Sequence, residues 1–110
     1  MNRENQEMRE FNIRQIKLIE KKIDEYKNDN IPIGLLISNL ETLLNYIQMP
    51  PQELIKKILD LVWNMEVIYS WALSKERSMT KEELAEINEH IKNISELLCQ
   101  YEQNNIQKDF

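Results

Sequence analysis

The stretch that decides the fold is LIKKILDLVWNMEVIYSWAL, residues 54–73. Spacings of four and three residues, the period of an α-helix with one packed seam, separate Leu54, Ile58, Leu61, Met65, Ile68 and Ala72. Three more large side chains, Trp63, Val67 and Trp71, lie on the side away from this seam. A helix that is apolar around most of its circumference must pack centrally among other helices or keep one side for a partner.

The composition of the chain favours a single all-helical domain. With 110 residues it is long enough to bury a core without a metal or a disulfide. One glycine, Gly34, and three prolines leave little with which to build hairpins, bulges or positive-φ turns. Cys99 is the only cysteine, and no apolar run approaches the length of a signal peptide or a membrane span. We therefore expect a cytoplasmic protein that does not enter a membrane.

Apolar periodicity and stop signals predict four helices, over residues 7–27, 32–48, 51–75 and 81–102, and a frayed tail over 103–110. Pro32 and Pro51 suit the first turns of their helices, and Thr80 with Glu83 forms a capping-box pattern. Because short loops join antiparallel neighbours, these helices predict an antiparallel four-helix bundle within one chain. The same heptads would also allow a coiled coil between chains, and a homodimer of bundles stays open.

The formal charge of −5 is concentrated toward the C-terminus, where residues 80–110 carry seven acidic and three basic groups. On the last helix, Glu82, Glu86, Glu89 and Glu96 point within about 40° of the direction opposite the apolar seam. This face either serves solubility or steers a basic partner toward the protein. Phosphate backbones and anionic lipid would repel it, so direct binding to nucleic acid or to a membrane is disfavoured.

Two features of the third helix have alternative interpretations. We expect the first helix to cover Trp63, Val67 and Trp71, because buried tryptophans belong to a core more often than to an interface; left exposed, they would anchor a partner. Glu66 lies on an otherwise apolar flank. It is expected to pair with a lysine or a tyrosine hydroxyl of the same chain, or else with a basic group on a partner.

The residues offer no catalytic arrangement. The only histidine, His90, lies nine residues before Cys99, which on one helix places them half a turn out of phase and about 13 Å apart along the axis. One histidine and one cysteine form no zinc ligand set, and no glycine-rich loop is present to hold a phosphate. We therefore expect no enzymatic activity, no metal and no cofactor.

His90 raises one enzyme-like alternative, the histidine phosphotransfer domain, which is a four-helix bundle of this size with one exposed histidine. The motif of that family has a lysine three residues after the histidine and a glycine next. Here Lys92 follows by two residues, and Ile94 stands four residues after His90. Both departures count against phosphotransfer, and we expect His90 to flank the apolar seam near Tyr101.

Residues 31–44, IPIGLLISNLETLL, are followed by WNMEVIY at 63–69 and by Ala72-Leu73. Over roughly residues 31–98 the chain resembles small helical immunity proteins encoded beside bacterial polymorphic toxins, including those of contact-dependent growth inhibition systems. The resemblance implies a cytosolic protein that binds a cognate toxin domain, often a nuclease, and blocks its active site or its access to substrate. It carries over no catalytic residue.

A nuclease cleft that holds phosphates tends to be basic, so the acidic face of the last helix matches this implied partner. Under this hypothesis the four glutamates at 82, 86, 89 and 96 steer the encounter. One of Trp63, Glu66 and Trp71 then anchors the complex. The competing hypothesis is a helical adaptor or regulatory protein that acts as a homodimer.

Overall fold

A computed structural model describes the backbone of residues 3–107 and the side chains of residues 6–103. It contains four helices: α1 (Arg3–Lys27), α2 (Ile33–Asn45), α3 (Gln52–Ser74) and α4 (Lys81–Gln107). No strand occurs among these residues, so the prediction of an all-helical chain is confirmed. In the same part of the chain, no helix combines the length and the apolar character needed to cross a membrane.

The helix boundaries differ from the predicted ones mainly at three ends. α1 begins at Arg3 rather than at residue 7, and α2 ends at Asn45 rather than at residue 48. α4 continues to Gln107, so residues 103–107 of the expected tail are helical, while residues 108–110 lie outside the described part. Pro32 and Pro51 are the N-cap residues of α2 and α3, immediately before the first turns in which they were expected.

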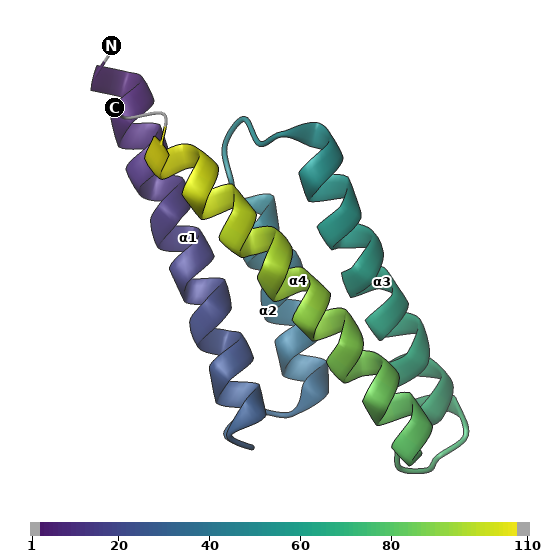
Figure 1. The fold of residues 1–110 in the computed structure, drawn as a ribbon. Coiled ribbons are helices and arrows are strands. Elements are labelled where there is room, and N and C mark those ends of the chain that lie inside the picture. The colour runs from purple at the N-terminus through teal and green to yellow at the C-terminus, as the bar shows by residue number, and fades with distance from the viewer. Residues whose placement is uncertain (1–2, 108–110) are drawn as a thin grey trace.

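Each helix packs against its neighbours in chain order. α1 packs closely against α2 and α4, and α3 packs closely against α2 and α4, whereas the backbones of α1 and α3 do not approach each other within the described residues. In Figure 1 the connections between successive helices lie at alternate ends of an elongated globule, which measures 53 × 26 × 19 Å. α3 therefore lies diagonally opposite α1, and only its inner face meets the rest of the protein.

The core is rich in isoleucine and is built from one face of each helix. The contribution of α3 is Ile58, Val62, Met65 and Ala72, whereas Leu54, Leu61 and Ile68 of the predicted seam are only half-buried. The buried line is thus rotated slightly from the predicted one, because α3 packs between α2 and α4 and turns the middle of its apolar face inward. The other helices contribute Ile16, Ile19, Ile23, Ile33, Leu36, Ile37, Leu40, Leu44, Ile87, Ile91, Ile94, Leu98 and Tyr101.

Asn12 is the only buried polar side chain among the described residues, and it joins three parts of the fold. Its amide Nδ2 donates to the carbonyl of Gln48 at 2.8 Å, and its Oδ1 accepts from the Gln48 N–H at 2.8 Å. The same Nδ2 donates to the hydroxyl of Tyr101 at 3.2 Å. The cluster holds the α2–α3 connection between α1 and α4. Because the backbone of Gln48 bonds to Asn12 instead of continuing the helix, α2 ends earlier than predicted.

A second polar contact between α1 and α4 joins two carboxyl groups, those of Glu20 and Glu102. Burial, followed by the hydrogen bond to Glu102 and its negative charge, raises the pKa of Glu20 to about 7. Of the other charged groups that face Glu20, Lys17 lowers its pKa and Asp24 raises it. The Glu20–Glu102 pair therefore binds a proton readily between α1 and α4, although both side chains are only half-buried.

Two helices end with a non-glycine residue in the left-handed region. After α1, Asp29 has φ 60°, the Asn30 N–H bonds the carbonyl of Glu25 and the Asp29 N–H bonds that of Tyr26. After α3, Glu76 has φ 52°, and the Arg77 N–H bonds the carbonyl of Ala72. Both are Schellman endings, in which the N–H of the residue after the left-handed one donates a hydrogen bond to a free carbonyl of the last helical turn. The chain thus makes positive-φ turns without glycine, contrary to the expectation drawn from its composition.

The predicted capping box at the start of α4 is confirmed. The Glu83 N–H donates to Thr80 Oγ1 at 3.1 Å, and the Thr80 N–H donates to Glu83 Oε1 at 2.9 Å. Arg77 adds a bidentate contact, with its two guanidinium nitrogens 2.8 and 3.1 Å from the Glu83 carboxylate. The hydrogen bonds from Arg77 and from the Thr80 backbone lower the pKa of Glu83 to about 2.

The left-handed conformation of Glu76 predicts that Glu76→Gly stabilises the protein. An L residue in this region costs about 1–2 kcal/mol, and glycine removes that cost while losing about 0.5–1 kcal/mol of chain entropy on folding. The expected net gain is about 0.5 kcal/mol, or a rise in Tm of about 2 °C by calorimetry. Glu76→Ala keeps the strain and should not raise Tm. A lower Tm for the glycine variant would contradict this account of the helix end.

The raised pKa of Glu20 predicts a pH-dependent gain in stability for Glu20→Gln. The stabilisation from protonated Glu20 is fully present below about pH 4.5 and is lost as the pH rises through about 7. The variant keeps a neutral group at the seam, so its free energy of unfolding should exceed that of the wild type more at pH 8 than at pH 5, measured by urea denaturation. Glu10→Gln removes a charge from an exposed position of α1 and is the control. An equal difference at both pH values would show that the carboxyl pair does not titrate as described.

Candidate functional site

Trp63, Val67 and Trp71 lie on the face of α3 that points away from the bundle. Their side chains are 63%, 46% and 56% exposed. They follow one another at intervals of four residues, which places them along one side of the helix, opposite the buried line through Ile58 and Met65. The expectation that the first helix covers them is wrong, because α1 packs against α2 and α4 and does not reach α3 in the described part of the fold.

A shallow hollow of about 460 Å³ lies on this outer face, and we call it the indole hollow. Its lining residues are Trp63, Glu66, Val67, Ser70, Trp71 and Ser74. The ammonium group of Lys75 lies 4.6 Å from the centroid of the Trp71 ring, in a cation–π contact. The hydroxyl of Ser74 donates to the Trp71 carbonyl at 2.8 Å and so is turned back onto the helix. The hollow thus combines two aromatic rings, one apolar residue and one carboxylate.

Glu66, at the edge of the indole hollow, contacts another acidic residue rather than a basic one. The pKa of Glu41 on α2 is raised by burial first, then by hydrogen bonding to Glu66 and by its negative charge, so the two carboxyl groups face each other. No basic group of the described residues lies within ion-pair distance of either carboxyl. The predicted internal partner, a lysine or a tyrosine hydroxyl, is therefore wrong.

Glu41 itself was missed in the sequence, although one signal was available. Gly34 is the only glycine, and a Cβ at this position would lie 2.8 Å from the hydroxyl oxygen of Tyr69, so the glycine allows α2 and α3 to approach closely. Glu41 follows Gly34 by seven residues, or two helical turns, and so lies on the same side of α2. The position of the glycine therefore indicates which side of α2 meets α3.

The acidic residues of α4 are exposed at all four predicted positions, Glu82, Glu86, Glu89 and Glu96. Glu86 Oε1 lies 3.8 Å from His90 Nε2, too far for a hydrogen bond. Glu96 stands apart from the others because it borders the space between α1 and α4. The acidic face thus remains accessible along α4, with its last member at the edge of a separate cleft.

His90 is poorly placed for phosphotransfer. Its side chain is only 16% exposed, and both ring nitrogens are buried without a hydrogen-bond partner among the described residues. A phosphoacceptor histidine must present a ring nitrogen to the active site of another protein. The position beside the apolar seam, which the spacing predicts, agrees with this burial, and Cys99 lies elsewhere on α4, exposed at the cleft.

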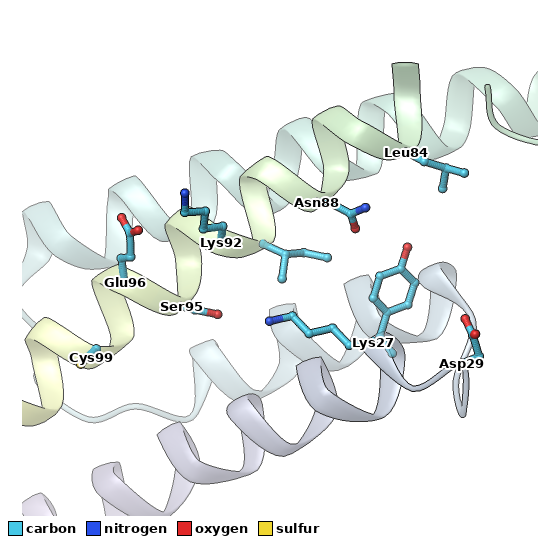
Figure 2. A pocket seen from close by; sticks show the side chains of 10 residues that line it. Lys27, Asp29, Leu84, Asn88, Lys92, Ser95, Glu96 and Cys99 are labelled. Carbon is cyan, nitrogen blue, oxygen red and sulfur yellow. The ribbon is translucent and has the colours of Figure 1, made fainter. Parts of the chain in front are cut away.

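An open cleft of about 680 Å³ separates the C-terminal end of α1 from α4. Figure 2 shows Lys27 reaching from α1 toward α4, with Asn88 and Ser95 turned into the gap and Lys92 and Glu96 pointing away from α1. Burial and the charge of Asp29 raise the pKa of the Tyr26 hydroxyl at this cleft. The remaining lining residues are Leu84, Ile91 and Cys99.

The sequence did not reveal this cleft, because it depends on the angle between two helices rather than on a pattern in either. Leu84 follows the inward heptad of α4 and was expected in the core, but it is 36% exposed because α1 and α4 diverge there. The charged lining residues are two lysines and two acids, which favour no single sign of ligand charge. Among the residues with described positions, no group of three histidine, cysteine or acidic side chains could hold a metal ion.

Comparison of the chain with models of protein families, with curated proteins and with solved structures finds no match. The resemblance of residues 31–98 to small helical immunity proteins therefore stays a prediction that depends on those residues. The geometry of the chain offers two exposed features for binding, which are the indole hollow on α3 and the acidic face of α4.

Proposed function

We propose that this chain is an immunity protein that binds a cognate bacterial toxin domain and neutralises it. The toxin domain is basic and nuclease-like, and the chain covers its active site without any turnover of its own. The protein acts in the cytoplasm of the producing cell, as an antiparallel bundle of four helices that presents a rigid surface. It contacts neither nucleic acid nor membrane directly.

The observation that carries this proposal is the exposed aromatic face of α3. Two tryptophans and a valine stand on one side of a helix, and no other helix of the described chain packs over them. Tryptophan is enriched among the residues that contribute most to protein–protein binding energy. Rigid aromatic anchors on a regular helix are what a protein needs in order to hold a partner tightly.

The charge distribution supports a basic partner. Glu82, Glu86 and Glu89 are exposed on α4, which packs directly against α3. Complementary charge accelerates the encounter of two proteins and discourages partners of the wrong sign. A cleft built to hold phosphates has the opposite sign to this face.

The experiment that tests the function combines binding with inhibition. Toxin domains encoded beside the gene are purified, and their nuclease activity is measured with and without the full chain. We expect one of them to bind and to lose its cleavage activity, and we expect a Trp63→Ala, Trp71→Ala double variant to bind at least tenfold more weakly. Absence of binding to every neighbouring domain, together with self-association in sedimentation, would favour the homodimeric adaptor instead.

Charge reversal on α4 tests the electrostatic part separately. Changing Glu82, Glu86, Glu89 and Glu96 to lysine should slow association with the toxin about tenfold or more at low salt and should flatten its salt dependence, because steering is lost. Stopped-flow kinetics over a range of ionic strength measures both quantities. A matched control reverses four exposed acids outside α4, Glu10, Asp24, Glu53 and Glu76. If both variants associate equally fast, then net charge alone acts and the α4 face has no special role.

A further inference from the structure

We propose that the indole hollow receives one arginine side chain of the partner protein. The guanidinium group stacks against the Trp63 indole beside Val67, next to Trp71, and forms an ion pair with Glu66. This inference rests on the proposed function only in assigning the arginine to the toxin domain. The binding chemistry of the hollow follows from its own residues.

The walls of the hollow favour a cation. Indole rings carry negative charge on their faces, so they attract a cation placed over the ring. Lys75 demonstrates this property in the free protein, because its ammonium group already lies over the Trp71 ring at 4.6 Å from the centroid. Trp63 and Trp71 are eight residues apart, about 12 Å along the axis, with Val67 midway between them. Val67 thus leaves room between the two tryptophans, where one planar group can lie against a single indole ring.

The edge of the hollow provides unneutralised negative charge. Glu66 lines the hollow, and its negative charge is one cause of the raised pKa of Glu41 on α2. Neither group has a basic partner within ion-pair distance in the part of the chain described. A cation that enters the hollow would form an ion pair with the Glu66 carboxylate. The hollow is thus complementary to positive charge at its edge and along its walls.

Arginine fits this arrangement better than lysine. Its guanidinium is planar, stacks on aromatic faces and is more weakly hydrated than an ammonium group. It can also donate two hydrogen bonds to one carboxylate while one of its faces stays against a ring. The hollow offers flat walls and a single carboxylate, which matches a planar donor.

The test uses a blocked tripeptide, acetyl-Gly-Arg-Gly-amide, titrated into the full isotope-labelled chain. The indole N–H signals of Trp63 and Trp71 are followed by NMR and assigned with Trp63→Phe and Trp71→Phe. We expect saturable shifts of both signals in the millimolar range. Peptides with citrulline or leucine in place of arginine, which have no charge, should bind at least fivefold more weakly.

A matched pair of variants tests the role of the carboxylate. Glu66→Gln should weaken binding of the arginine peptide by roughly fivefold, as expected for loss of an exposed ion pair next to an aromatic contact. Glu53→Gln removes the same charge from an exposed position of α3 outside the hollow and should leave binding unchanged. Equal loss in the two variants would overturn the proposal, since it would show attraction by net charge only.

Three other results would also overturn it. The first is no indole shift at tens of millimolar arginine peptide, and the second is equal binding of the leucine peptide. The third is an indole shift that depends on protein concentration without any peptide, because a second copy of the chain would then fill the hollow.

The outcome of this test is separable from that of the proposed function. A toxin domain that is neutralised equally by the wild type and by Glu66→Gln would leave the function standing without the arginine site. Specific arginine binding without any neutralised toxin would leave the site standing without that partner.

Discussion

The Asn12 cluster is the interaction on which the arrangement of the helices depends. One buried amide holds both polar groups of the Gln48 backbone and also meets the Tyr101 hydroxyl. Leaving such a buried group without a partner costs about 1–3 kcal/mol, so the loop and the end of α4 are held at a defined place on α1. The cluster closes one end of the bundle, and the cleft at Tyr26 and Leu84 opens where α1 and α4 are no longer joined.

The Asn12 cluster also bears on which side of α3 stays exposed. Because the α2–α3 connection is attached to α1, α3 begins beside α2 and runs diagonally opposite α1. Its inner line through Ile58, Val62 and Met65 belongs to the core, and none of the four described helices packs on its outer side. The exposed tryptophans therefore result from the topology rather than from an incomplete core. The proposed contact with a partner depends on this exposed side of α3.

The sequence predicted the features that depend on local patterns. The number of helices and the capping box follow from spacing and from the preferences of single residues, as with Thr80 and Glu83. The features that it did not predict depend on which helices become neighbours. The apolar period of α3 could not indicate whether α1 would cover Trp63, and no pattern near Glu66 indicated that another carboxyl group, from Glu41, would face it. Asn12 was missed because a lone asparagine in a polar helix gives no periodic signal.

The contact between Lys75 and Trp71 bears on how the proposed arginine would bind. An exposed indole invites nonspecific association, and the lysine side chain covers part of this ring in the free chain. A cation–π contact at an exposed site is worth only about 0.5–1 kcal/mol, so a better-placed cation can displace the lysine at little cost. Trp63 has no such contact in the described structure, and it lies at the end of the hollow farther from Lys75. A partner group would therefore meet an open ring at Trp63 first and would compete with the lysine only at Trp71.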